Sequence, residues 1–441
     1  MTQKERMLTA SDFMGAEAPS EDDLYKCVHC GLCLNVCPTY LETGLETESP
    51  RGRIYLMRAV NEGRVKITEA VNSHWSLCLE CRACEVACPS GVPYGHMMEL
   101  TRTQALRRQP GSFSTRLFRW ITFRQLLPHQ GRLVLLARLA RIYQRSGLKS
   151  LVSRSKALRL LPGNVDMLHD NQPTIPAEIF GPSSAVYPAL GERKGRVALL
   201  SGCIMPLIYT DAMNATVRVL QHNGYDVVVP MGQGCCGALN AHAGVRDEAR
   251  AMAKRNIDAF LAYEPDAIIV NSAGCGSTMK EYTLLIEEGS PYAEKAERFV
   301  ALVKDVNEFL VTLPFQEGLG EIKARVTYQD PCHLAHAQRI TKAPRELLKT
   351  IPGVELVEME EASVCCGAAG SYSVTQQAFS QRLMKRKTAH LAEAGADVVA
   401  TANPGCLIQL QTALNNADLP GRVCHVVELL DESYRAGVSS E

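Results

Sequence analysis

The stretch Cys27-Val-His-Cys30-Gly-Leu-Cys33-Leu-Asn-Val-Cys37-Pro38 reads C-x2-C-x2-C-x3-C-P, and the pattern recurs as Cys78-Leu-Glu-Cys81-Arg-Ala-Cys84-Glu-Val-Ala-Cys88-Pro89. Two-residue spacers wrap a tight loop around one corner of a cubane cluster, so that three thiolates reach three irons. A fourth cysteine followed by proline is typical of bacterial ferredoxins with two clusters. Two complete copies of the motif therefore predict an N-terminal domain that binds two [4Fe–4S] clusters and carries electrons.

The fourth cysteine of each motif starts a segment that points away from its own loop, and in two-cluster ferredoxins it ligates the other cluster. The spacing therefore predicts two crossed ligand sets. Cluster one takes Cys27, Cys30, Cys33 and Cys88, and cluster two takes Cys78, Cys81, Cys84 and Cys37.

Structural zinc is the alternative for this domain. Zinc sites usually pair two Cys-x2-Cys knuckles across a longer loop, which these motifs do not resemble. Between the motifs lies Ser49-Pro-Arg-Gly-Arg-Ile54. Its two arginines either screen the charge of a cluster, contact a partner, or form ordinary solvated surface.

The remaining cysteines contain an internal repeat. Of 17 cysteines, 16 fall into four groups of four, and the third and fourth groups match each other at offsets of 129, 130 and 131 residues. Cys424 is left over and is expected in the core. The repeated groups are Cys203, Cys235, Cys236 and Cys275, and then Cys332, Cys365, Cys366 and Cys406.

Each repeat alternates short apolar runs with helical stretches, which indicates a parallel sheet. Helices are expected at about 207–223 and 336–350, and strands at 226–230, 267–270, 354–359 and 398–400. The cysteines follow the strands, and open α/β sheets bind ligands at the carboxyl ends of their strands. Each lobe thus offers four thiols to a metal or redox centre. Alternatively these cysteines are buried as small apolar side chains.

The bulk numbers indicate a multidomain protein with no membrane span. The chain has 441 residues, 47 basic and 47 acidic, yet residues 101–165 contain 14 Lys or Arg and no Asp or Glu. No apolar leader or 20-residue apolar run is present, so we expect a cytoplasmic location, peripheral on the inner face of the membrane. The fold class is α+β multidomain. We expect a two-cluster α-helical ferredoxin domain (1–100), a basic helical connector (101–194) and two duplicated α/β Cys-Cys-Gly lobes (195–323 and 324–441).

The connector contains an amphipathic helix from Leu133 to Arg145. Leu135, Leu139 and Ile142 share one face, and arginines occupy the adjacent face. Residues 102–159 could therefore contact an anionic membrane, pack on an acidic partner subunit, or form a core helix with solvated arginines. Nucleic acid is not expected, because no recognition module accompanies the charge.

No glycine-rich flavin or nucleotide fingerprint and no Walker loop is evident. Each [4Fe–4S] cluster carries one electron, whereas oxidation of a 2-hydroxy acid releases two. A flavin must divide that pair. If the chain supports such an oxidation, the FAD is on partner subunits.

The two lobes resemble the cysteine-rich domains of heterodisulfide reductase. In that family the last element is Cys-x-x-Cys, whereas Thr278 and Gln409 stand in place of its second cysteine here. The whole chain resembles the iron–sulfur subunit family of bacterial glycolate oxidase. The segments that carry this resemblance are Cys27-Val-His-Cys30-Gly, Pro50-Arg-Gly-Arg-Ile-Tyr55, Ser90-Gly-Val92, Cys235-Cys-Gly-Ala238, Ser272-Ala-Gly-Cys-Gly276, Lys280-Glu-Tyr282, Cys365-Cys-Gly367, Thr401-Ala-Asn403 and Gly405-Cys406.

The resemblance implies an electron-transfer subunit that works with flavin-binding subunits oxidising glycolate to glyoxylate and passes electrons towards quinone. It also implies a possible further iron–sulfur centre in the lobes. Two alternatives stay open: a heterodisulfide-reductase-like thiol/disulfide enzyme, and the equivalent subunit of lactate or glycerol-3-phosphate oxidation. His333 and His336 are candidate ligands or proton carriers, or are simply hydrogen-bonded.

Overall fold

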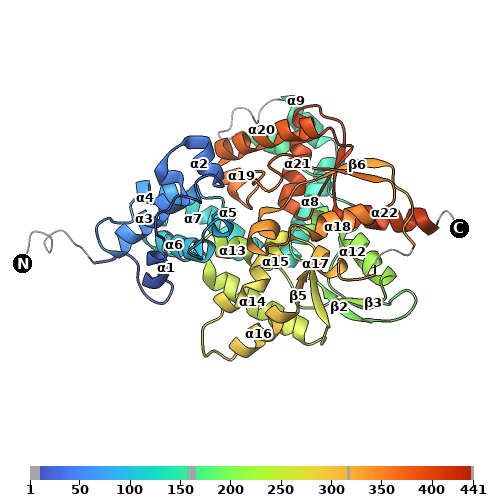
Figure 1. The fold of residues 1–441 in the computed structure, drawn as a ribbon, viewed down its shortest axis with the longest axis horizontal. Coiled ribbons are helices and arrows are strands. Elements are labelled where there is room, and N and C mark those ends of the chain that lie inside the picture. The colour runs from blue at the N-terminus through green and yellow to red at the C-terminus, as the bar shows by residue number, and fades with distance from the viewer. Residues whose placement is uncertain (1–9, 156–157, 159–164, 315–317, 439–441) are drawn as a thin grey trace, which may run out of the picture.

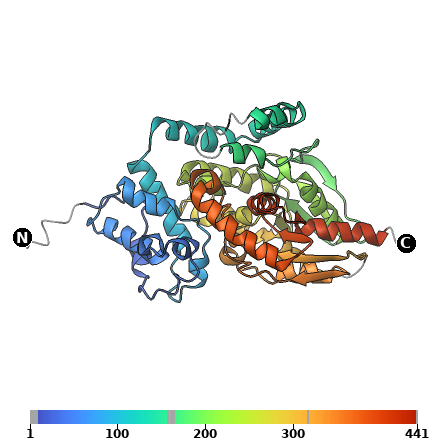
Figure 2. The ribbon, with the colours of Figure 1, turned by 90° about the horizontal axis from the view of Figure 1, so that it is seen from above.

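The computed structural model describes residues 10–155, 158, 165–314 and 318–438. The N-terminal helical domain lies at one end of the molecule, and the two α/β lobes lie together at the other (Figure 1). Seen from above, the helices of the connector run as a layer along one side (Figure 2). No helix within the described ranges is long and apolar enough to cross a membrane.

The N-terminal domain is built from short helices around a core that contains Trp75, Met57 and Met98. Several helices begin at residues that favour helix starts: Ser49 accepts a hydrogen bond from the N–H of Gly52, with Pro50 in the first turn. The last helix, α6, runs past the expected boundary at residue 100, and its Ala105 belongs to this core. The helices are α1 (Glu21–Tyr25), α2 (Pro38–Thr43), α3 (Pro50–Asn61), α4 (Glu69–Ser76), α5 (Ala83–Val86) and α6 (Tyr94–Arg108).

The first lobe has a five-stranded sheet in the order β1-β3-β2-β4-β5. Strands β2 to β5 are parallel, as the alternation of strands and helices predicts, and only β1 is antiparallel. Strand β1 lies before residue 195, within the segment expected to be linker. The strands are β1 (Ser183–Tyr187), β2 (Gly195–Leu199), β3 (Tyr225–Val229), β4 (Ala267–Val270) and β5 (Val303–Asp305), and the main helices are α12 (Thr210–His222), α14 (Arg246–Leu261), α15 (Ala273–Lys280) and α17 (Val306–Leu310).

The second lobe repeats this arrangement with four parallel strands in the order β7-β6-β8-β9. The helix expected at about 336–350 is interrupted: a π-helical turn, η5 (His333–Ala337), precedes α18 (Ala343–Thr350). The other elements are β6 (Ala324–Tyr328), β7 (Val354–Val357), β8 (Val398–Thr401), β9 (Arg422–His425), α19 (Tyr372–Thr375), α20 (Gln377–Ala394), α21 (Pro404–Asn416) and α22 (Val426–Val438).

The two lobes share one hydrophobic core. Helix α12 of the first lobe packs against α22 of the second, and Leu220, Tyr328 and Leu430 belong to the same buried cluster. Arg218 donates two hydrogen bonds to the Asp431 carboxylate across this interface, at 2.7 and 2.8 Å. Cys424 is buried in this cluster, as expected. The lobes therefore form one unit, with the carboxyl ends of both sheets facing a common space.

The connector packs on the first lobe by one face and leaves another face exposed. Its described helices are α7 (Phe113–Arg119), the π-helix η2 (Trp120–Leu126), α8 (Gln130–Arg145), α9 (Leu148–Ser155) and α10 (Val165–Asp170). Leu133 and Ala137 of α8 pack beside Cys203 and Cys235. Leu135, Leu139 and Ile142 are 59%, 55% and 64% exposed. The interpretation of the face with Leu135, Leu139 and Ile142 as part of a core is therefore wrong, because α8 packs inward by the neighbouring face, which carries Leu133 and Ala137.

Candidate functional site

The two cysteine motifs share one feature of their backbone. In each loop the residue before the second cysteine and the residue after it have positive φ: His29 (58°) and Gly31 (86°) in the first, Glu80 (53°) and Arg82 (61°) in the second. This left-handed conformation is costly for residues other than glycine and clusters at functional sites. The shared conformation supports the same role for both loops.

The first motif surrounds a small cavity of about 30 Å³. Its walls include all four thiols expected for cluster one, Cys27, Cys30, Cys33 and Cys88, together with Arg51. A Cβ on Gly31 would lie 2.6 Å from Arg51 Nη1, so a larger residue there would displace this guanidinium, and the φ of 86° also favours glycine. Cys30 is exposed to solvent. The donor set and the cavity fit a cluster near the molecular surface.

The thiol set expected for cluster two is buried. Cys37, Cys78, Cys81 and Cys84 are each no more than 9% exposed. Burial raises the pKa of the Cys84 thiol well above its usual value, and the neighbouring thiols Cys81, Cys78 and Cys37 raise it further. The four thiols expected for cluster two therefore lie together, and their mutual repulsion is of the kind that a bound metal centre would relieve.

The two arginines between the motifs differ. Arg53 is 1% exposed, donates to Glu48, Thr39 and the His74 carbonyl, and lies near Cys37 and Cys78. Arg51 is partly exposed and forms a two-fold ion pair with Glu46. The interpretation of both as solvated surface is therefore wrong for Arg53, which places a fixed positive charge beside the second thiol set.

Each lobe brings its four cysteines into one hydrogen-bonded group. Cys235 accepts from Cys203 and Cys236, and these bonds, despite the opposing effect of burial, lower its pKa well below the usual value. In the second lobe the corresponding acceptor is the other member of the pair. Cys366 accepts from Cys365 and Cys406, and its pKa is likewise lowered.

A buried cation stands beside each group. Arg255 of α14 lowers the pKa of Cys235, and its Nε and Nη2 atoms are buried without a hydrogen-bond partner among the described residues. Lys387 of the equivalent helix α20 is 2% exposed and acts in the same way on Cys366. Four thiols with a buried cation fit a bound anionic centre better than plain core packing, which would need no charge.

Both groups open into one cavity of about 630 Å³. All eight lobe cysteines line it, together with Cys78 from the second motif and Phe118 and Phe123 from the connector. Cys81 packs in one apolar cluster with Cys332 and Cys365. After burial, Cys332 is the strongest influence raising the pKa of Cys81. The second motif is thus a direct neighbour of the second lobe's thiols.

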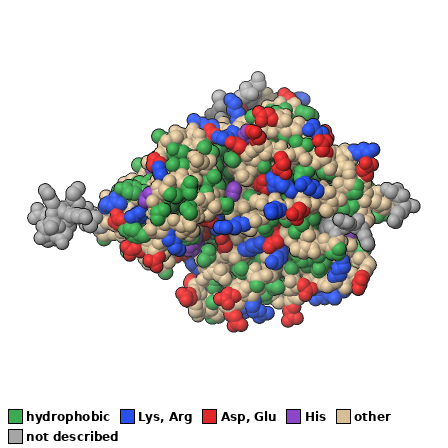
Figure 3. All heavy atoms as spheres, viewed as in Figure 1, with side chains coloured by type: hydrophobic (Ala, Val, Ile, Leu, Met, Phe, Trp, Pro, Cys, Tyr) green, Lys and Arg blue, Asp and Glu red, His purple; other side chains and the backbone are tan. Residues whose placement is uncertain are grey.

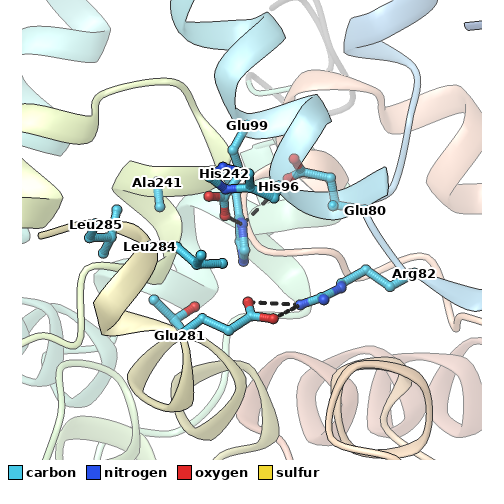
Figure 4. Close-up of a pocket in the computed structure, with 11 residues that line it drawn as sticks. Glu80, Arg82, His96, Glu99, Ala241, His242, Glu281, Leu284 and Leu285 are labelled. Atoms are coloured by element: carbon cyan, nitrogen blue, oxygen red, sulfur yellow. Dashed lines mark hydrogen bonds and ion pairs between the residues drawn. The ribbon is translucent and has the colours of Figure 1, made fainter. Parts of the chain in front are cut away.

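A cluster of charged residues joins the N-terminal domain to the first lobe (Figure 4). Arg82 donates to Glu281 at 2.8 Å. Glu80 is 4% exposed and pairs with Arg102 at 2.7 Å. His242 lies beside Glu99 and Glu80, at 2.9 and 3.5 Å. None of these residues was singled out from the sequence, although two charged residues inside a cysteine motif were a visible signal.

The remaining predicted residues are also placed. His333 Nε2 donates to the Glu80 carbonyl at 2.8 Å, and His336 Nε2 donates to the Ser363 carbonyl at 3.0 Å. His333 also lines the large cavity, whereas His336 does not. Thr278 is buried, and Gln409 donates to Ser380, so neither position adds a thiol to its group.

The fold and its thiol groups define an electron-carrying iron–sulfur protein with a dicluster domain and two cysteine-rich lobes. Residues 23–92 match the "4Fe-4S dicluster domain" model, which favours iron–sulfur over zinc, and residues 197–280 and 326–411 match the "Cysteine-rich domain" model. Residues 114–169 match the model "Glycolate oxidase iron-sulfur subunit, linker region".

Comparison with curated proteins agrees over the full length. The chain is 40% identical to the probable glycolate oxidase iron–sulfur subunit of Bacillus subtilis, covering 98% of each chain, and 30% identical to that of Escherichia coli, covering 97% and 98%. It is 27% identical to one subunit of the fumarate reductase (CoM/CoB) of Methanothermobacter marburgensis, covering 92% of this chain and 72% of that one. The chain belongs to the glycolate oxidase iron–sulfur subunit family, and it is an electron-transfer subunit of that complex.

Proposed function

We propose that this subunit takes electrons from a flavin-bearing partner that oxidises glycolate to glyoxylate and delivers them to a quinone. The observation that carries the proposal is the contact between Cys81 of the second motif and Cys332 of the second lobe, at the wall of the large cavity. It makes the thiols of the ferredoxin domain and those of the lobes neighbours, so one continuous route can lead from the first motif to the cavity.

The two motifs would hold the clusters in the crossed sets, Cys27, Cys30, Cys33 and Cys88, and Cys78, Cys81, Cys84 and Cys37. Each bound [4Fe–4S] cluster supplies a one-electron carrier, so the flavin that divides the electron pair stands on a partner. The protein's part is to hold the thiolates and to balance their charge. Arg53 does so at the second set from a buried position.

The lobes would hold a further redox centre. Their hydrogen-bonded thiols, with Arg255 and Lys387 beside them, are suited to an anionic iron–sulfur group. Each lobe supplies four thiols and no fifth, because Thr278 and Gln409 occupy that position.

The exposed first motif would meet the flavin subunit. Val28 and Leu32 within its loop are 68% and 57% exposed. Hydrophobic side chains gather over this end of the molecule, on the N-terminal helical domain (Figure 3). Apolar residues in a surface loop beside a redox centre are typical of a docking face.

The exposed face of the connector would lie on the membrane that holds the quinone. Phe113, Trp120, Leu139 and Ile142 are all at least 50% exposed, and residues 101–165 carry no acidic side chain. Exposed apolar and aromatic groups among arginines fit the interface of an anionic bilayer. Vesicle sedimentation tests this: Leu139→Asp with Ile142→Asp should abolish binding to anionic vesicles, whereas Val438→Asp, equally exposed but on α22, should not.

Metal analysis tests the electron route. The anaerobically purified complex should contain more than about eight irons and eight sulfides per copy of this chain, because two cubanes account for only that number. Glycolate, rather than lactate or glycerol 3-phosphate, should reduce the clusters as seen by EPR. A content of about eight irons would mean that the lobes hold no cluster and have thiol or docking roles. Reduction of the clusters by lactate alone would make lactate, not glycolate, the substrate of the complex.

One observation favours a second function. The neighbouring thiols lower the pKa of Cys235 and of Cys366, which favours the thiolate form of one cysteine in each lobe, and thiolates attack disulfides. A thiol/disulfide reductase would reduce a mixed-disulfide substrate with dithionite as electron donor. Absence of that turnover in the iron-loaded chain would remove this alternative.

A further inference from the structure

A small cavity of about 20 Å³ lies between the second motif, α6 and the first lobe, and its walls include Glu99, His242 and Glu281 (Figure 4). Leu284, which is 47% exposed, also borders it, so this cavity reaches the surface. Glu80 and His242 line both this cavity and the large one. These two residues therefore separate a surface pocket from the space that holds the lobe thiols.

His242 is held so that its two ring nitrogens differ. Nδ1 donates to Glu99 Oε1 at 2.9 Å, and Arg246 fixes the other oxygen of that carboxylate at 3.0 Å. Nε2 is buried and has no hydrogen-bond partner among the described residues. Because Nδ1 is hydrogen-bonded to Glu99, Nε2 is the ring nitrogen that is left to hydrogen-bond with a molecule in the large cavity.

The charges around His242 favour its protonated form. Glu80, Glu99, Arg102, Arg246 and His333 face it from the second motif, α6, α14 and η5, and the rings of His242 and His333 lie 5.2 Å apart edge to face. Burial lowers the pKa of His242, but the two carboxylates outweigh this and raise it above the usual value. A buried imidazole whose pKa is raised in this way by facing carboxylates is suited to donate a proton.

The large cavity is suited to a lipophilic acceptor. Phe118, Phe123 and Ile208 contribute apolar walls. Phe118 is 47% exposed and belongs to the connector face proposed to meet the membrane. A quinone leaving the bilayer would therefore meet this wall, whereas His242 lies on the wall formed by the N-terminal domain and the first lobe.

We propose that His242 delivers protons from Glu99 and the surface pocket to a quinone-class acceptor in the large cavity. The proposal rests on the proposed function, which supplies the electrons. One quinone takes up two electrons from the subunit and two protons to become a hydroquinone. Each proton passes from His242 Nε2 to a quinone oxygen, which leaves a neutral ring with its remaining proton on Nδ1. A flip of the ring then brings the bare nitrogen to the Glu99 side, where it is protonated from solvent, and turns the other N–H towards the cavity for the next transfer.

The test uses the complete complex with its flavin subunits and two acceptors. A short-chain quinone needs protons on reduction, whereas ferricyanide takes one electron and none. His242→Gln should slow quinone reduction by about 100-fold or more, the usual range for loss of a positioned acid, and leave ferricyanide reduction within about two-fold. Glu99→Gln should act in the same direction. His222→Gln, a histidine stacked on Tyr434 away from both cavities, is the matched control.

Two further readouts separate proton delivery from a structural role. Quinone reduction by the wild-type complex should fall as pH rises through the pKa of His242, since only the protonated ring donates, and His242→Gln should lose this limb. In His242→Gly, added imidazole should restore quinone reduction. Iron content and dithionite-reduced EPR spectra should not change in any of these variants.

Failure of the proton relay and failure of the proposed function would give different results. Unchanged quinone reduction in His242→Gln would overturn the relay and leave quinone as the acceptor. Equal loss with both acceptors, without rescue by imidazole, would make His242 a structural residue. A wild-type complex that reduces ferricyanide but no quinone would overturn the proposed acceptor, and the relay with it.

Discussion

The two cysteine motifs have the same spacing and the same pair of positive-φ positions, but they occupy opposite environments. The loop of the first motif lies on the surface, with Cys30 exposed and Val28 68% exposed. The loop of the second is covered by the lobes, and its Cys81 packs in one cluster with Cys332. Ligand spacing therefore determines which centre each loop can hold. The residues between the ligands determine what that centre faces.

The difference resides in two side chains per loop. At the two positions with positive φ the first loop has His29 and Gly31, whereas the second has Glu80 and Arg82. Glu80 pairs with Arg102, and Arg82 reaches Glu281 of the first lobe. The second loop bears the cost of a left-handed arginine, offset by the ion pair of Arg82 with Glu281 that docks the loop on the first lobe. One loop is thus exposed at the surface, as the proposed docking of a partner requires, and the other contacts its own chain.

The largest expected effect separates the two loops by acceptor. Cys81→Ser should lower the rate of quinone reduction by more than about 100-fold. This loss exceeds the roughly 10–100-fold effect of removing a residue that only hydrogen-bonds to a metal ligand, because Cys81 is itself an expected ligand. Ferricyanide reduction should persist through the first motif. Cys30→Ser should instead slow reduction of both acceptors, because electrons from the flavin no longer enter. Identical acceptor profiles for the two variants, measured by steady-state kinetics, would break the comparison.

The arginines beside the two motifs should differ in their effect on stability. Arg53→Met removes the arginine partner of the buried Glu48 carboxylate, which keeps only its contact with His74, and should lower the free energy of unfolding by about 3–5 kcal/mol. Arg51→Met removes a partly exposed pair with Glu46 and should cost about 1 kcal/mol or less. Urea unfolding of the iron-loaded subunit measures both. Similar losses of stability in the two variants would show that the surroundings of Arg51 and Arg53 differ less than the burial of these two side chains indicates.

The smallest effect concerns the exposed loop alone. Val28→Asp with Leu32→Asp should weaken binding of the flavin subunit by about ten-fold or more, since burying each side chain contributes about 1.5–3 kcal/mol. Dithionite should still reduce the clusters fully. Val374→Asp, an exposed valine of α19 in the second lobe, is the control. Binding is measured by titration of the purified subunits, and unchanged affinity would move the docking face elsewhere.

Local pattern predicted much of this architecture. The repeat offsets and the apolar runs located the parallel strands and the thiols at their ends, because these features depend on short stretches of sequence. The contact between Glu80 and His242 could not be predicted from the sequence, because it depends on how the N-terminal domain docks on the first lobe. The exposure of Leu135 could not be predicted either. An amphipathic pattern shows which residues share a helix face, but it was tertiary packing that buried the face with Leu133 and Ala137.

The burial of the second motif has a consequence for biogenesis. The four thiols expected to hold the second cluster are at most 9% exposed in the folded chain, because the lobes cover the loop. A scaffold protein that transfers a preformed cluster must touch the receiving thiolates during ligand exchange. Maturation would therefore have an order: the second cluster would be inserted while the N-terminal domain is still undocked, and closure onto the lobes afterwards would retain it. The first site stays open to repair throughout the life of the protein.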